Sequence, residues 1–323
     1  MKRCVFLLVY FGSFNEYFPF FLKTCAFNNE YDWLIITDNQ VDYSYPSNCF
    51  KVNMTLKEFN VLASIKLGMN IEIIKPYKLC DFKPAFGLIF EDYIKEYMYW
   101  GHCDCDLIFG DLNKFLTKLF ENEYDKIFAA GHLTLYKNTK DNNKLFMSEF
   151  DGIKIYKDVY VSDEIFVFDE DYNTNKNFRI NIHTIFINKN MKIFDEDFSL
   201  NPKINSAEFI NMVYSREDRN FIAKKNIDAR YYWDKGKIYS INNNGNKREY
   251  LYAHFQMRKM RFNQKELKEE IIEILPDRFL ARKKILNKKR IKLSYLFWYD
   301  YYTKKIVNKL KKIRRNCRAK NFE

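Results

Sequence analysis

Two aspartates, Asp104 and Asp106, are the residues whose type and position best suit metal chemistry. Two acids separated by one residue are uninformative alone, because 42 acidic residues among 323 produce about five such pairs by chance. This pair, however, follows the run YMYWGHC at residues 97–103, which predicts a buried strand, where solvated acids are not expected. Because strand side chains alternate between faces, His102, Asp104 and Asp106 should share one side.

Two carboxylates that converge at a strand end repel each other unless a cation lies between them. Oxygen ligands favour Mn²⁺ or Mg²⁺, and such a cation can bridge a nucleotide diphosphate and stabilise its charge as the leaving group departs. The alternative metal site would use His102, Cys103 and Cys105 to bind zinc or copper. Strand alternation separates those ligands, so the carboxylate site is favoured.

Three charged residues, Lys78, Asp81 and Lys83, interrupt the aromatic segment KPYKLCDFKPAFG at residues 75–87. A lysine here could reach a donor phosphate, and Asp81 could reach donor hydroxyls. The alternative is the start of an ordinary amphipathic helix, which the spacing does not exclude.

His254 ends the strand-like run YLYAH and precedes the basic residues Arg258 and Lys259. One interpretation makes His254 a third metal ligand and places Arg258 or Lys259 on the phosphates of a donor. The alternative is a structural histidine.

Further candidates lie between the acidic pair and His254. His132, in a predicted turn and strand, could contact a donor or acceptor sugar. Asp169 and Glu170 end an apolar run and offer carboxylates for an acceptor hydroxyl, and Asp163 is an equally simple candidate. Spacing does not choose between these carboxylates, and a structural role is the alternative for His132.

Predicted strands and helices alternate through the first 130 residues, which indicates an α/β fold with a mostly parallel sheet. Ligands bind beyond the carboxyl ends of such strands. Four residues besides the acidic pair should therefore border the same site: Phe11, Gly12, Ser13 and Asp38. Strands are expected at 5–10, 33–37, 50–53, 97–103 and 126–130, and helices at 17–27, 55–67, 84–97 and 112–120.

The remaining pattern is less regular. It predicts short strands at 164–168 and 184–187 and a hairpin over 230–241, and it turns helical and highly charged after about residue 264. We therefore expect an α/β domain over residues 1–263 and a helical, basic extension over residues 264–323.

The basic charge is concentrated at the C-terminal end. Residues 280–323 contain 16 Lys and Arg against 2 acids, whereas the rest of the chain contains 38 against 40. Together with aromatic residues at 291–299, this charge predicts an amphipathic helix on an anionic membrane surface. A helix packed on the body is one alternative. Nucleic-acid binding is another, but no recognition motif supports it and the neutral body disfavours it.

Cysteine usage and hydropathy narrow the class of protein. The seven cysteines are odd in number and contain no CxxC pair, which favours a reducing compartment over a disulfide framework. No apolar run approaches the roughly 18 residues that a membrane span needs.

Six segments in order resemble a bacterial family of capsular polysaccharide or lipopolysaccharide glycosyltransferases: YFGSFNEYFPFFLKTC, LIITDN, KPYKLCDFKPAFG, YWGHCDCDLIFGDL, GHLTLYKN and YAHFQMRK. The resemblance spans about residues 5–260. It implies a Rossmann-like GT-A fold with a mixed, mostly parallel sheet flanked by helices, in which Asp104 and Asp106 bind Mn²⁺ and a nucleotide-sugar diphosphate.

More distantly, the acidic pair with a late histidine resembles the glycogenin and lipopolysaccharide galactosyltransferase group. That resemblance implies that His254 completes the metal site. The glycine and Lys-Pro-Trp that usually follow the histidine are absent here, and Arg258 is the candidate substitute.

These observations together predict a hexosyltransferase that moves a sugar from a nucleotide donor, with UDP as the favoured nucleotide, to a bacterial surface polysaccharide or lipid-linked glycan. The expected location is cytoplasmic, at the inner face of the cytoplasmic membrane. The alternatives are a nucleic-acid-binding protein that uses the basic tail and a non-catalytic, membrane-associated assembly factor.

Overall fold

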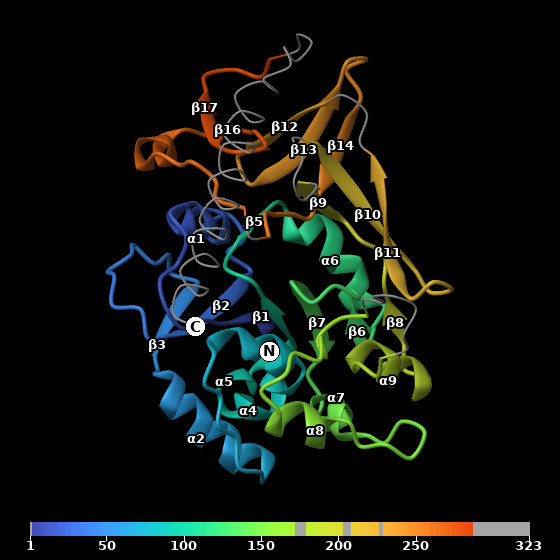
Figure 1. The fold of residues 1–323 in the computed structure, drawn as a ribbon. Helices are drawn as coiled ribbons and strands as arrows, with labels where there is room; N and C mark the ends of the chain where they lie inside the picture. The colour runs from blue at the N-terminus through green and yellow to red at the C-terminus, as the bar shows by residue number, and fades with distance from the viewer. Residues whose placement is uncertain (1, 172–178, 203–207, 226–228, 257, 287–323) are drawn as a thin grey trace, which may run out of the picture.

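The computed structural model describes residues 2–171, 179–202, 208–225, 229–256 and 258–286. At its centre lies a seven-stranded sheet (Figure 1). Its first four strands are parallel to one another, β7 is antiparallel to β4 and β6, and β8 is parallel to β6. The predicted α/β fold with a mixed, mostly parallel sheet is confirmed. In sheet order the strands are β3 (Cys49–Asn53), β2 (Tyr31–Thr37), β1 (Lys2–Val9), β4 (Tyr97–Cys103), β7 (Leu133–Lys137), β6 (Lys126–Ile127) and β8 (Ile193–Phe194).

Helices cover both faces of this sheet. Along β1, Phe6 and Leu8 join one core and Val5 and Leu7 join the other, so the continuous apolar run reflects burial on both faces. The first core contains α1 and α6, and the second contains α2, the short helices α3–α5, α8 and α9. The helices are α1 (Phe18–Ala26), α2 (Leu56–Leu67), α3 (Leu79–Phe82), α4 (Phe86–Ile89), α5 (Glu91–Ile94), α6 (Leu112–Glu121), α7 (Lys140–Lys144), α8 (Tyr156–Val161) and α9 (Ile182–Asn188).

Local sequence signals set several of these boundaries. Thr55 and Glu58 form a capping box at the start of α2, and Gly68 ends that helix with a left-handed φ of 65°. Asp111 caps α6 by accepting a hydrogen bond from the amide of Lys114. The helix expected over residues 84–97 is instead divided into the short helices α4 and α5 and ends before β4.

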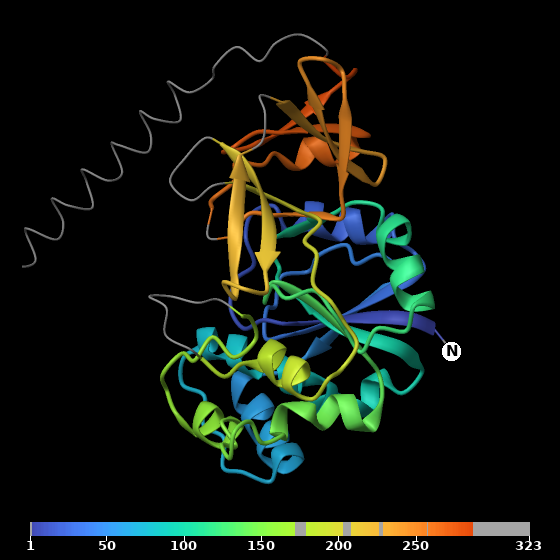
Figure 2. The same cartoon turned by 90° about the vertical axis from the view of Figure 1, so that its right-hand side faces the viewer.

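Two smaller sheets extend the molecule on one side of the central sheet (Figures 1 and 2). The hairpin predicted over residues 230–241 is confirmed as β12 and β13, with Lys235 and Gly236 at positive φ in its turn. One small sheet contains β11 (Asn220–Lys225), β10 (Phe209–Ser215), β9 (Ser199–Pro202), β15 (Tyr252–His254) and β5 (Leu107–Phe109). The other contains β14 (Lys247–Tyr250), β13 (Lys237–Asn242), β12 (Ala229–Asp234), β16 (Ile271–Ile274) and β17 (Phe279–Arg282).

The pairing of β5 with β15 joins two segments that lie far apart in the sequence. The strands run antiparallel, with His254 opposite Leu107 and Tyr252 opposite Phe109. Since β5 begins directly after the acidic pair, this register places His254 beside Asp106. The amide of Phe255 extends the pairing by donating to the Asp106 carbonyl at 3.2 Å.

Two short strands expected from the sequence are wrong. Residues 184–187 lie inside α9, where Asn181 and Thr184 form a reciprocal cap that starts a helix. Residues 164–168 form no strand, because the amides of Phe166 and Phe168 donate to the Asp81 carboxylate rather than to a neighbouring strand.

The helical extension expected from residue 264 is also wrong for residues 264–286. After a short 3₁₀ helix, η4 (Gln264–Lys268), the chain forms β16 and β17, and β16 pairs with β12. Ile272 and Ile274 lie in the core, and their period-two spacing favours a strand. The tail predicted at residues 287–323 lies outside the described residues. Within the described part of the chain, no helix is both long and apolar enough to cross a membrane.

We predict that Asn28→Ala lowers the free energy of unfolding by about 3 kcal/mol, because buried polar groups lose their partners. Asn28 donates to the Gly110 carbonyl at 2.9 Å and accepts from the Leu112 amide at 2.9 Å, so it anchors the chain directly after β5. Chemical denaturation measures the change. The exposed Asn122→Ala is the matched control and should change stability by less than about 0.5 kcal/mol. Equal effects in the two variants would contradict the anchoring role.

Candidate active site

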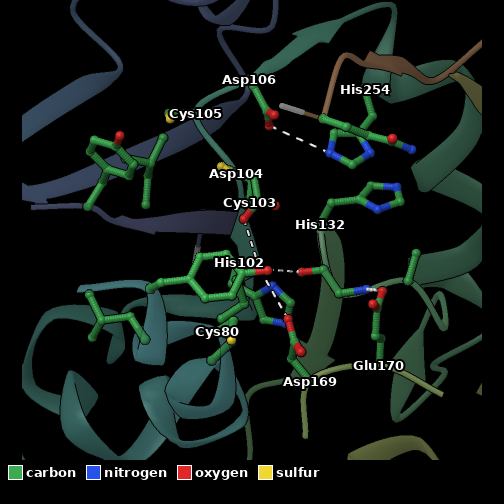
Figure 3. Close-up of a pocket in the computed structure, with 18 of the residues that line it drawn as sticks. Cys80, His102, Cys103, Asp104, Cys105, Asp106, His132, Asp169, Glu170 and His254 are labelled. Carbon is green, nitrogen blue, oxygen red and sulfur yellow. Dashed lines mark hydrogen bonds and ion pairs between the residues drawn. The ribbon is translucent and has the colours of Figure 1, made fainter. Parts of the chain in front are cut away.

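The structure brings together the three residues predicted as metal ligands. Ligand atoms of Asp104, Asp106 and His254 all lie within 4.8 Å of one another. Figure 3 shows both carboxylates entering one cavity from the strand β4 side, with the His254 ring facing Asp106. The Nε2 atom of His254 is 3.7 Å from Asp106 Oδ1, too far for a hydrogen bond.

Unsatisfied atoms at this cluster fit a divalent cation. Within the described chain, the buried Oδ1 atom of Asp106 and Nδ1 atom of His254 have no hydrogen-bond partner, and native structures rarely leave such atoms unpaired. Two carboxylates and an imidazole form a donor set that suits Mn²⁺. A second acidic group, Cys80 with Asp81 and Asp169, is less suitable because both of its carboxylates already contact lysines.

Burial sets the protonation of the candidate ligands. Burial, with repulsion from Asp104, raises the pKa of Asp106 well above its usual value. Burial lowers the pKa of His254 to about 4, and the Asp104 carboxylate only partly opposes this effect. His254 is therefore neutral near pH 7, which is the form that binds metals. A cation would favour ionised Asp106, which burial alone disfavours.

Lys83 joins this cluster to a second pair of carboxylates. Its ammonium contacts Asp104 Oδ1 at 2.8 Å, Asp169 Oδ2 at 3.1 Å and the Gly131 carbonyl at 2.8 Å. These three partners use all the donors of a lysine. Burial tends to lower the pKa of Lys83, but attraction to Asp104 and Asp169 outweighs it, so the pKa lies well above the usual value. Lys83 was predicted to bind the donor, and the structure places it between the Asp104 and Asp169 carboxylates.

Asp169 and Glu170 lie together at the cavity wall opposite the metal cluster (Figure 3). Burial raises the pKa of Asp169 to about 7, with Lys83 opposing and Glu170 adding to the shift. Burial also raises the pKa of Glu170, which accepts a hydrogen bond from the Gly131 amide at 3.0 Å. A carboxylate that titrates near pH 7 is suited to proton transfer.

Position 131 must be glycine for the Asp169 and Glu170 carboxylates to lie against the backbone there. A Cβ atom at this position would lie 2.4 Å from Asp169 Oδ2 and 3.2 Å from Glu170 Oε2. The neighbouring His132 stacks on His254, with ring centroids 4.0 Å apart, and its Nε2 pairs with the Tyr252 hydroxyl at 2.8 Å. His132 thus supports the candidate ligand as well as lining the cavity.

The three candidate metal ligands, Lys83, His132, Asp169 and Glu170 line one cavity of about 1300 Å³. Such a volume exceeds the usual range for small ligands and suits a donor together with an acceptor. One end is polar and charged, while the hairpin β10–β11 contributes Ile210, Met212 and Phe221 to another part of the wall. Predicted site residues that line the cavity are Phe11, Lys83, Asp104, Asp106, His132, Asp169, Glu170, His254 and Arg258.

Six predicted site residues lie outside the cavity lining. Asp163, Gly12 and Ser13 are exposed. Asp38 accepts a hydrogen bond from the Gly12 amide at 2.7 Å, so this pair shapes the loop that carries Phe11. Lys78 and Asp81 are buried and pair with each other at 2.8 Å, which leaves neither side chain directed at a donor.

Some residues that line the cavity were not predicted as site residues from the sequence. His102 was treated only as part of a rival metal site, yet it is fully buried at the cavity and both ring nitrogens lack a partner among the described residues. Its place on β4, two residues before Asp104, was the available signal. The hairpin residues Ile210, Met212 and Phe221 gave no signal, because their approach depends on strand pairing far from the acidic pair.

Comparisons with known proteins give one family and several structural neighbours. The model of a family described as "Family of unknown function (DUF6625)" matches residues 6–283. No curated protein sequence matches the chain.

The structural neighbours are glycosyltransferases at low similarity. An active-site mutant of LgtC is 11% identical with a TM-score of 0.36, over 80% of this chain and 88% of that one. Mouse xyloside xylosyltransferase 1 is 10% identical with a TM-score of 0.34, over 62% and 87%. The glycosyltransferase GlyE of Streptococcus pneumoniae TIGR4 is 13% identical with a TM-score of 0.32, over 62% of this chain and 46% of that one.

We predict that Gly131→Ala lowers the free energy of unfolding by about 1–3 kcal/mol, the usual cost of overpacking, because the added methyl collides with the Asp169 carboxylate. Urea denaturation measures this cost. In an Asp169→Ala background the same substitution should cost much less, since its main obstacle is gone. An unchanged cost in that background would show that the carboxylate does not enforce glycine.

Proposed function

The chain belongs to the family of unknown function DUF6625, and we propose that it is a metal-dependent glycosyltransferase that uses a nucleotide-sugar donor. The observation that carries the proposal is the convergence of Asp104, Asp106 and His254 within 4.8 Å at one end of a large cavity. We propose a UDP-hexose as the donor, as the sequence analysis predicts.

At the metal end, Asp104, Asp106 and His254 would hold Mn²⁺ or Mg²⁺. When bound, this ion would supply positive charge to the diphosphate of the donor as the bond to the sugar breaks. Arg258 also lines the cavity, where its Nη1 donates to the Pro276 carbonyl at 2.8 Å, and it is the residue that we propose contacts the same phosphates. Phe11 offers an apolar surface for the nucleoside at the carboxyl end of β1.

At the opposite wall, Asp169 and Glu170 would bind hydroxyl groups of the sugar or acceptor. Asp169 is the better candidate to accept a proton, because burial raises its pKa to about 7. Lys83 holds Asp169 and Asp104 on either side of one ammonium, so it fixes the separation between the metal end and this wall.

The acceptor would enter beside the hairpin β10–β11. Ile210, Met212 and Phe221 form apolar wall there, and an acceptor that carries an apolar group would bury it against them. A lipid-linked glycan or a growing bacterial surface polysaccharide is the acceptor class that we propose.

The basic C-terminal residues support a place at a membrane. Residues 280–323 carry 16 Lys and Arg against 2 acids, so they would attract an anionic surface and bring the cavity near a lipid-linked acceptor. We propose the inner face of the cytoplasmic membrane as this surface.

Calorimetric titration tests the metal cluster. We expect UDP to bind in the presence of Mn²⁺ and to bind at least about tenfold more weakly in Asp106→Ala, because even outer-shell partners of metal sites contribute 10–100-fold to affinity. Asp163→Ala removes an exposed carboxylate outside the cavity and should leave binding unchanged. Wild-type protein that binds no nucleotide with either metal would refute the proposed function.

Sedimentation with lipid vesicles tests the membrane surface. We expect the full chain, but not a chain that ends at residue 286, to pellet with vesicles rich in phosphatidylglycerol, and added salt should weaken this binding. Neutral phosphatidylcholine vesicles are the control. Binding to RNA or DNA in preference to the anionic vesicles would instead support a nucleic-acid partner.

A further inference from the structure

The wall that carries Asp169 and Glu170 contains a backbone conformation that its sequence disfavours. Val167 has a φ of +56° and lines the cavity. A β-branched residue in the left-handed region is a true outlier, because its side chain collides with its own backbone. Such conformations persist only where surrounding contacts enforce them.

The enforcing contacts come from Asp81. Its Oδ2 atom accepts the Phe166 amide at 3.0 Å and its Oδ1 atom accepts the Phe168 amide at 2.9 Å. One fully buried carboxylate therefore holds the backbone on both sides of Val167. Charge-assisted bonds to two amides in a dry environment are among the stronger hydrogen bonds in proteins.

Lys78 also holds this segment, and we call Asp81 and Lys78 together the clamp. Its ammonium pairs with Asp81 Oδ2 at 2.8 Å and also donates to the carbonyl of Glu164. The clamp therefore contacts the start of segment 164–170 as well. At the other end, the Phe168 carbonyl accepts the Ile182 amide at 2.9 Å. Both lysine and aspartate lie outside the cavity, so their charges act on this segment and not on a ligand.

The clamp and the cavity share one short stretch of chain. Asp81 holds the segment at Phe168, one residue before Asp169, while Lys83, two residues after Asp81, contacts Asp169 itself at 3.1 Å. Segments 78–83 and 164–170 are thus joined twice. The Asp81 carboxylate accepts hydrogen bonds from backbone amides of the second segment, and Lys83 forms an ion pair with Asp169. Moving Phe168 would move Asp169 relative to Lys83 and Asp104.

We propose that Asp81 is a positioning residue, which holds Val167 in its left-handed conformation and thereby directs the Asp169 and Glu170 carboxylates into the cavity. Its effect on turnover rests on the proposed function, whereas its effect on the backbone does not. The role replaces the donor contact expected for Asp81 from the sequence.

Hydrogen exchange and turnover of Asp81→Asn test the proposal. Exchange in the peptide 164–171 should become at least about tenfold faster, because asparagine offers one acceptor oxygen in place of two. The kcat for sugar transfer or donor hydrolysis should fall about 10–100-fold, the usual cost of a small misplacement. The Kd for UDP with Mn²⁺ should stay within about twofold, since the metal cluster is untouched. Loss of UDP binding, or unchanged exchange, would overturn the proposal.

A second substitution separates positioning from general stability. In the Asp81→Asn background, Val167→Gly should recover much of the lost kcat, because glycine adopts positive φ without cost. Val167→Ala removes nearly the same side chain but keeps the Cβ, which still disfavours positive φ, so it should recover clearly less kcat than glycine. If Asp81→Asn alone fails to fold, recovery of folded protein with glycine but not alanine supports the clamp. Equal behaviour of the two double variants overturns it.

The two proposals fail in different ways. If the wild-type protein binds no nucleotide, the proposed function is refuted, and the exchange of peptide 164–171 still decides whether Asp81 holds the backbone. If nucleotide binds but exchange is the same in wild type and Asp81→Asn, only the positioning role is refuted.

Discussion

Four carboxylates crowd one cavity, and the ammonium of Lys83 lies between them. Asp104, Asp106, Asp169 and Glu170 repel one another, and burial raises the pKa of the last three. Lys83 contacts two of the four directly and offsets part of this cost. The surrounding elements must hold the groups together against their repulsion, and a bound cation or a proton must supply the remaining positive charge.

The scaffold meets this demand with contacts between distant parts of the chain. β4 ends at the acidic pair, and the pairing of β5 with β15 fixes His254 opposite Leu107. His132 stacks on His254, and Gly131 allows Asp169 to approach because it has no side chain. Each contact involves a backbone or a buried ring with little freedom, which keeps the charged groups of the cavity in fixed positions.

The same logic explains why buried ionic groups occur outside the cavity. Lys78 and Asp81 pair at 2.8 Å in the interior, where replacing them with apolar residues would often stabilise a fold. Their role is to hold the backbone on both sides of Val167, which has a left-handed conformation. The strain is located next to the carboxylates whose placement matters most, which is where stored strain is usually found in functional sites.

The sequence by itself determined the layers of the fold and the chain position of the acidic pair. Apolar runs at 5–10, 33–37 and 97–103 predicted β1, β2 and β4, and the helices expected at 55–67 and 112–120 correspond to α2 and α6, because periodicity and capping are local properties. It could not decide that residues 184–187 are helical, since a short apolar run fits either state.

Only the tertiary structure decided which charged side chains contact one another. Lys78 and Asp81 looked like ligand-binding residues but face each other, Lys83 faces carboxylates, and His254 meets Asp106 across about 150 residues of chain. The physical reason is that strand register and burial fix these meetings, and both depend on contacts between segments far apart in sequence.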